Sequence, residues 1–93
     1  MRPWGGAVSR KVLENTEAVL QGYTRGFALE VAPTPAGTVE VEWATPDASV
    51  FAEVGETKLS ITGVKDDAIF LSEHIDFDDT GALADLWERL NGG

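Results

Sequence analysis

The chain has 93 residues, 43% hydrophobic and 25% charged, which are the proportions of one ordinary globular domain. It contains no cysteine and only one histidine, which excludes disulfides, thiolate metal sites, cysteine catalysis and multi-histidine metal sites. Its 7 basic and 16 acidic residues give a net charge of −9, which disfavours binding to nucleic-acid phosphates and to anionic membranes.

The first residues predict an arm followed by a helix. Residues 1–8 contain Gly and Pro and are expected to form a flexible arm, from which Trp4 packs back onto the domain or contacts a partner. Residues 9–21 are predicted to be helical, with Ser9 as the N-cap and Gly22 in the left-handed conformation that ends a helix. One face of this helix carries Val12, Thr16, Val19 and Tyr23, with Leu13 and Leu20 beside it.

Five segments in which apolar and polar residues alternate come next, and this alternation predicts strands. The segments are 27–32, 39–43, 50–54, 58–62 and 68–75. Between the third and fourth segments, Gly55–Glu56 fits a two-residue hairpin loop with glycine at its first position. Gly63–Asp67 is predicted to be a loop. In the fifth segment, Ile69 and Leu71 are expected to point into the core.

The end of the chain predicts a second helix. Its apolar residues recur at the spacing of one helix face and are Leu83, Leu86, Trp87 and Leu90. Asp78 or Asp79 is expected to cap its start, and Gly92 follows its end. Because the connections are short, sequential strands are expected to pair with one another. The sequence therefore predicts a single α+β domain over residues 9–93, in which a five-stranded antiparallel meander sheet is flanked by an N-terminal and a C-terminal helix in the order α-β-β-β-β-β-α.

Acidic and aromatic residues within the strands form the first candidate site. The glutamates in predicted strands are Glu30, Glu40, Glu42, Glu53 and Glu73. Several of them are expected to share the outward face of the sheet, where their mutual repulsion favours a basic partner. Phe51 and Phe70 are expected to point away from the core, which predicts a surface buried in a dimer or by a partner. The alternatives are a solvated strand face, a helix that covers these rings, or a register shifted by one residue. The candidate partner-binding residues are Glu40, Glu42, Trp43, Phe51, Glu53 and Phe70.

The stretch from Ser72 to Gly81 is the second candidate site. In a continued strand, His74, Asp76 and Asp78 would project on one side, where they could bind a divalent cation or act as an acid–base pair. Helix capping by aspartate and an exposed strand position for the histidine explain the same residues without a site. The stretch also matches part of a calcium-binding loop, but position 12 requires a bidentate glutamate and holds Trp87. These residues are weak metal-binding candidates, and no cofactor is indicated.

These features predict a small acidic, non-enzymatic protein–protein interaction domain, a homodimer that binds a basic protein partner. One alternative is a nucleic-acid mimic that inhibits a DNA- or RNA-binding protein, of the kind that phages and mobile elements encode. Another is a small enzyme or cation-binding protein that uses His74 with Asp76 or Asp78. No apolar stretch reaches the length of a membrane span, and Met1–Gly6 is not followed by the apolar region of a secretory signal, so we expect a cytoplasmic protein.

Overall fold

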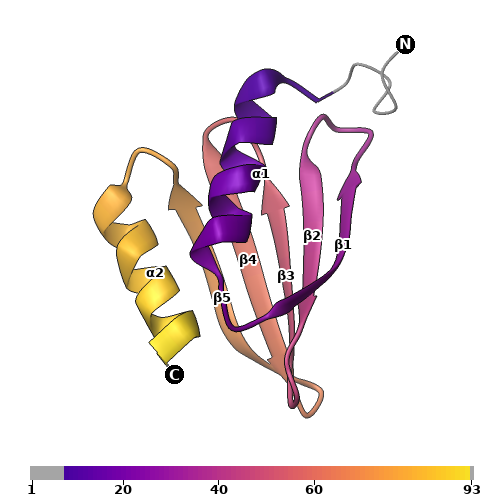
Figure 1. The fold of residues 1–93 in the computed structure, drawn as a ribbon, viewed down its shortest axis with the longest axis vertical. Helices are drawn as coiled ribbons and strands as arrows, with labels where there is room; N and C mark the ends of the chain where they lie inside the picture. Colours follow the sequence, from indigo (N-terminus) through magenta and orange to yellow (C-terminus); the bar gives the residue numbers. More distant parts are fainter. Residues whose placement is uncertain (1–7, 93) are drawn as a thin grey trace.

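The computed structural model describes residues 8–92, which form one antiparallel sheet and two helices (Figure 1). The elements are α1 (Arg10–Gly22), β1 (Phe27–Pro33), β2 (Val39–Ala44), β3 (Ser49–Val54), β4 (Lys58–Lys65), β5 (Ala68–Asp76) and α2 (Thr80–Gly92). The strands lie side by side in chain order, and every neighbouring pair is antiparallel. The predicted α+β fold, with a five-stranded meander between two helices, is therefore confirmed. The predicted arm at residues 1–8 and its Trp4 lie outside the described residues, apart from Val8.

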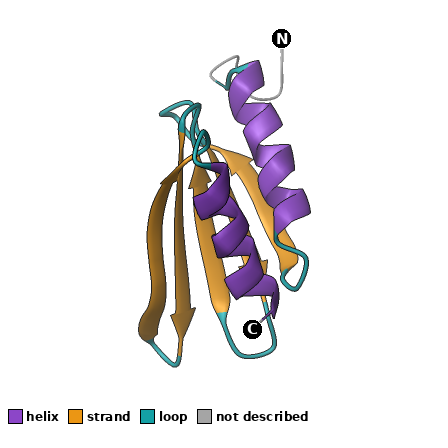
Figure 2. Ribbon diagram, turned by 90° about the vertical axis from the view of Figure 1, so that its left-hand side faces the viewer, coloured by secondary structure: helices purple, strands orange, loops and turns teal. Residues whose placement is uncertain are grey.

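Both helices lie on the same face of the sheet (Figure 2). α1 packs on β2 and β3, and α2 lies on the side of the molecule that carries β5. The core between helices and sheet is aliphatic, with one aromatic contact in which the rings of Tyr23 and Trp43 meet edge to face at 5.3 Å. Burial raises the pKa of the Tyr23 hydroxyl. Neither helix in residues 8–92 is both long and apolar enough to cross a membrane.

α1 forms as the sequence predicts, except at its end. The side chain of Ser9 accepts a hydrogen bond from the Val12 amide, as an N-cap does. The four residues of the predicted apolar face are all buried, whereas Leu13, predicted beside it, is 41% exposed. Gly22, in contrast, is the last helical residue and is not left-handed. A Cβ atom at this position would lie 2.5 Å from the indole of Trp87, so the glycine permits the close approach of α2 and does not end the helix through its own conformation.

Two asparagine side chains fix α1 in place. Asn15 is buried, and its amide donates hydrogen bonds of 3.0 Å to the carbonyls of Gly55 and Glu56, in the turn between β3 and β4. Asn91 of α2 accepts a hydrogen bond from the Thr24 amide and donates one to the Gly22 carbonyl. The side chains therefore satisfy backbone groups in two connections and link them to the helices.

The hairpin of β4 and β5 differs from its prediction. The predicted loop at Gly63–Asp67 is a two-residue turn, in which Asp66 and Asp67 have φ angles of 53° and 63°. Positive φ at both central residues is the signature of the turn whose twist matches a β-hairpin. The predicted two-residue loop at Gly55–Glu56 is also wrong, because residues 55–57 separate β3 from β4 and Gly55 does not have a positive φ.

A bulge at the start of β5 reverses the predicted orientation of its first side chains. Ile69 pairs with Val64 and Leu71 pairs with Gly63, so Phe70 is the extra residue. A Cβ atom on Gly63 would lie 2.6 Å from the Phe70 ring, and Gly63 belongs to the buried, helix-facing set of β4. Phe70 therefore lies on the helix side of the sheet, and Ile69, predicted to be in the core, is 66% exposed.

Candidate interaction surface on the outer face of the sheet

The outer face of the sheet is the face opposite the two helices, and its side chains form regular rows across the strands. Because side chains alternate along a strand, the residues between the buried ones point to this face. The antiparallel register then aligns them across the sheet. The first row is Phe27, Ala44, Ser49, Val64 and Ile69; the second is Glu30, Glu42, Phe51, Thr62 and Ser72; the third is Ala32, Glu40, Glu53, Ser60 and His74.

The β1–β3 half of this face carries four glutamates, which we call the outer-face glutamates: Glu30, Glu40, Glu42 and Glu53. They form two directly opposed pairs, Glu30 with Glu42 and Glu40 with Glu53. Like charges in such pairs destabilise a sheet. The ion pairs of the described residues involve Asp76, Asp47 and Glu73, so none of them neutralises an outer-face glutamate. The hydroxyl of Thr38 donates a 2.7 Å hydrogen bond to Glu53.

The first row and the adjacent Phe51 form an apolar end of the outer face. Phe27 is 73% exposed, Ile69 is 66% exposed and Phe51 is 42% exposed. The small side chains of Ala44 and Ser49 lie between these larger ones. Large apolar side chains that share one face of a sheet and remain in contact with water are typical of a surface that another molecule covers.

The β4–β5 half of the outer face is neutral. Its second and third rows contain serine, threonine and the single histidine, and Ser60 shares a hydrogen bond of 2.9 Å with Nδ1 of His74. Beyond the third row, Lys58 and Asp76 pair at 3.2 Å. The negative charge of the outer face is therefore confined to one side of it.

An ion pair joins two turns next to the apolar end. Lys65 precedes the turn between β4 and β5, and its ammonium lies 3.1 Å from the carboxylate of Asp47, in the turn between β2 and β3. The hydrogen bond from Lys65 lowers the pKa of Asp47, and the same bond raises the pKa of Lys65. Both side chains are about half exposed or more, so the pair adds little stability, but it ties together the two turns that border the first row.

The structure brings together four of the six residues that the sequence predicts for partner binding. Glu40, Glu42, Phe51 and Glu53 are neighbours on the outer face. The prediction that Trp43 belongs to this surface is wrong. Its side chain is 1% exposed, because the alternation that turns Glu42 outward turns Trp43 into the core.

Two further expectations about this surface are corrected. Phe70 is 53% exposed but lies on the helix side, because of the bulge. Glu73 pairs with Ile61 of the inward set and meets Arg89 of α2 at 3.6 Å, so it is not part of the acidic strip. Phe27 and Ile69 also belong to this surface although the sequence did not predict them as part of it, and Ile69 was expected to lie in the core. A bulge in each edge strand shifts the alternation there, and the apolar neighbours of both residues give no sign of it.

Two of the residues predicted as weak metal ligands, His74 and Asp76, bond to other side chains. His74 bonds to Ser60, Asp76 pairs with Lys58, and the described residues contain no group of three potential ligands that could hold a metal ion. In the partial calcium-loop match, Asp79 accepts a hydrogen bond from the Ala82 amide and caps α2, which confirms the capping prediction.

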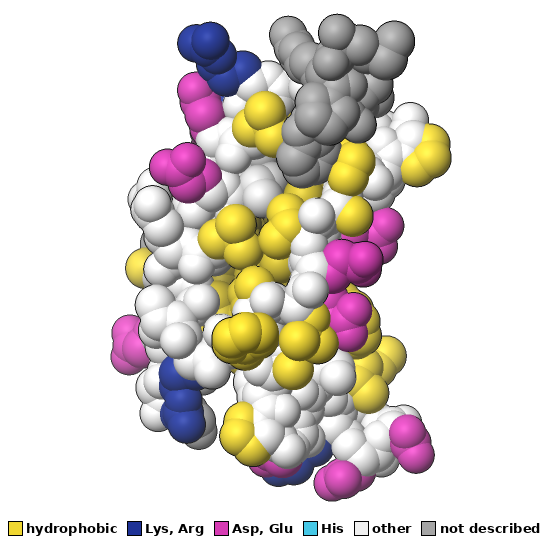
Figure 3. All heavy atoms as spheres, turned by 45° about the vertical axis from the view of Figure 1, so that its right-hand side comes forward, with side chains coloured by type: hydrophobic (Ala, Val, Ile, Leu, Met, Phe, Trp, Pro, Cys, Tyr) yellow, Lys and Arg dark blue, Asp and Glu magenta, His cyan; other side chains and the backbone are white. Residues whose placement is uncertain are grey.

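β1 is a second exposed apolar region. It is an edge strand, and Leu29 and Val31 are 58% and 39% exposed although Val41, the partner of Val31, is buried. α1 therefore shields the helix-facing side of β2 from solvent but not that of β1. On the side of the molecule that carries β1, hydrophobic side chains gather in the middle of the surface, with acidic side chains beside them (Figure 3).

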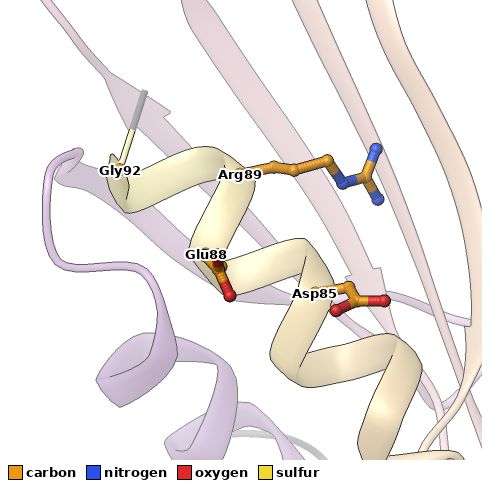
Figure 4. Close-up of a pocket in the computed structure, with 4 residues that line it drawn as sticks. All are labelled: Asp85, Glu88, Arg89 and Gly92. Carbon is orange, nitrogen blue, oxygen red and sulfur yellow. The ribbon is translucent and has the colours of Figure 1, made fainter.

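A shallow hollow of about 470 Å³ lies along α2 and offers a different kind of surface. It is lined by Asp85, Glu88, Arg89 and Gly92, all from this helix. Arg89 and Asp85 project from the same side of α2 (Figure 4). The hollow is open to solvent, and two carboxylates and one guanidinium line it.

The outer face is the surface whose chemistry is most specific. Carboxylates on neighbouring strands accept hydrogen bonds from lysine or arginine, and the apolar end adds area that water solvates poorly. Comparison of the chain with protein-family models, with curated proteins and with solved structures finds no match.

Proposed function

We propose that this protein is an interaction domain that binds a basic protein partner through the outer face of its sheet. The observation that carries the proposal is the direct opposition of Glu30 with Glu42 and of Glu40 with Glu53. Like charges placed directly opposite each other on neighbouring strands lower the stability of the sheet. A lysine or arginine placed between two opposed carboxylates replaces this repulsion with attraction, so binding relieves a cost that the free protein carries.

We propose that the role is binding and not catalysis. The one histidine contacts Ser60, and its carboxylate neighbour two residues along the strand, Asp76, pairs with Lys58. Neither contact joins the histidine to an acid, as an acid–base pair requires. A nucleic-acid mimic is less well supported, because such a protein concentrates carboxylates on one face. Here Glu14, Glu17 and Glu88 lie on the helices, on the other side of the molecule from the outer-face glutamates.

The proposal is tested with two triple variants that change the net charge equally. Glu40→Gln, Glu42→Gln and Glu53→Gln alter the outer face, and Glu14→Gln, Glu17→Gln and Glu88→Gln alter the exposed faces of the helices. Both variants and the wild type serve as bait in a lysate of the source organism, at about 50 mM and at about 500 mM salt. We expect basic proteins to bind the wild type and the helix variant at low salt, to be lost with the outer-face variant, and to be released at high salt. Identical retention by the two variants, or no retention by the wild type, would contradict the proposal.

A further inference from the structure

We infer that the partner presents an amphipathic helix to the outer face, with an apolar side chain on the apolar end and basic side chains one and two turns along the helix. This inference rests on the proposed function, because it names the kind of segment that the same surface binds. It draws on three features of the outer face: the hydrogen bonding of its backbone, the spacing of its rows and the separation of its charges.

The backbone of the sheet favours a helical occupant over an extended one. In the interior of the sheet the backbone N–H and C=O groups bond to neighbouring strands, so a molecule lying on the face meets side chains only. An extended segment on that face would bury many of its own N–H and C=O groups without partners, which is unfavourable. A helix satisfies these groups internally. The chain itself covers the opposite face of the sheet with two helices.

The row spacing matches the repeat of a helix. Successive rows are two residues apart along each strand, which is about 6.7 Å. Residues four apart on a helix are separated by about 6 Å along its axis, and residues eight apart by about 12 Å. A helix parallel to the strands therefore places residues i, i+4 and i+8 over the first, second and third rows. Position i faces Ala44 and Ser49, between the larger apolar side chains, and the next two positions face Glu42 and Glu40.

The charge distribution sets the position of the helix and argues against a second copy of this chain as the occupant. The outer-face glutamates lie on β1–β3, so basic residues at i+4 and i+8 bind best over β2 and β3. Phe51 lies between Glu42 and Thr62 in the second row, where its ring can contact the aliphatic part of an arginine or lysine. A second copy of the outer face would bring four more glutamates to the same interface, and like charges there are unfavourable.

Synthetic peptides test the inference directly. The probe is an 18-residue peptide with leucine at i and arginine at i+4 and i+8 in a background of alanine and glutamine. Its control has the same composition, arranged so that leucine and arginine fall on opposite helix faces. Titration calorimetry measures binding to the wild type and to Phe51→Ser, and circular dichroism measures the helix content of the bound peptide. We expect the probe to bind the wild type at least about tenfold more tightly than the control does, and to bind Phe51→Ser about tenfold more weakly than the wild type. We also expect the helix content of the probe to increase on binding.

Further variants separate this inference from the proposed function. Phe51 is partly exposed, so its replacement leaves the core intact, and the circular dichroism spectrum of the free variant verifies this. The two peptides could bind equally well, and the outer-face triple variant could weaken this binding while the helix variant does not. That result would overturn the inference of a helical partner and leave the proposed function standing. Peptide binding that both triple variants weaken equally would overturn both. A wild-type dimer that Phe51→Ser dissociates would also overturn the inference, because a second copy would then be the occupant.

Discussion

Asp66 and Asp67 hold left-handed backbone conformations in the turn between β4 and β5, with φ of 53° and 63°. Aspartate adopts this conformation less easily than glycine, because its Cβ atom approaches the backbone carbonyl. The two-residue turn requires it at both positions, because only then does the turn match the twist of the strands. The backbone of these two aspartates is therefore strained, and the paired strands on either side hold it in this conformation.

We expect Asp67→Gly to raise the free energy of unfolding by about 1 kcal/mol, since it creates the Asp-Gly sequence that this turn favours. Urea denaturation followed by circular dichroism measures the change. Asp85→Gly is the matched control: the same substitution in the middle of α2 is expected to lower the free energy of unfolding by roughly 0.3 kcal/mol. A loss of stability with Asp67→Gly would contradict the assignment of the turn.

At the scale of elements, the alternation of apolar and polar residues correctly predicted which side chains face the core wherever a strand has no bulge. β2 and β3 lie in the centre of the sheet, and their inward and outward residues follow the pattern without a shift, so Glu40, Glu42, Phe51 and Glu53 share the outer face. The pattern also turns Trp43 inward, which is why its inclusion among surface residues was wrong.

The edge strands could not be predicted in the same way. Ile69, Phe70 and Leu71 are all apolar, so the sequence gives no sign of where the bulge falls, although a shift by one residue decides which side chain faces water. The reason for Gly22 was equally hidden, because it depends on Trp87, which is 65 residues away in the chain.

Asn15 is the side chain through which α1 holds the turn between β3 and β4. We expect Asn15→Ala to lower the free energy of unfolding by about 1–3 kcal/mol, because the carbonyls of Gly55 and Glu56 lose their buried donor. Hydrogen exchange should also show faster exchange around this turn than in the wild type. The control Glu14→Ala, on the exposed side of α1, is expected to change stability by no more than about 0.5 kcal/mol. Equal effects of the two substitutions would show that the asparagine bonds contribute nothing.

At the scale of the whole molecule, the described residues include an acidic outer face and an apolar β1 edge, which differ in character. The homodimer predicted from the sequence stays a prediction, and β1 suits it better than the outer face because Leu29 and Val31 carry no charge. The bulge in β1 and Pro33 at its end discourage pairing with another strand, so we expect the contact to involve side chains more than backbone.

Light scattering at low and at high salt tests this expectation. We expect the mass of two chains at both salt concentrations, because apolar contacts are not screened, and the mass of one chain for Val31→Asp. Phe51→Ser, on the other surface, should leave the dimer intact. A wild-type mass of one chain under both conditions would rule out self-association through β1.

The order of the strands has a consequence for how the chain folds. Each strand pairs with the strand next to it in the sequence, so the sheet can grow by one hairpin after another, with short loops to close at each step. The bond from Asn91 to Gly22 spans 69 residues and joins α2 to the end of α1. Among the side-chain hydrogen bonds of residues 8–92 this one closes the longest loop. We therefore expect the contact between the two helices to form late in folding, and a nascent chain can complete it only after α2 has been synthesised.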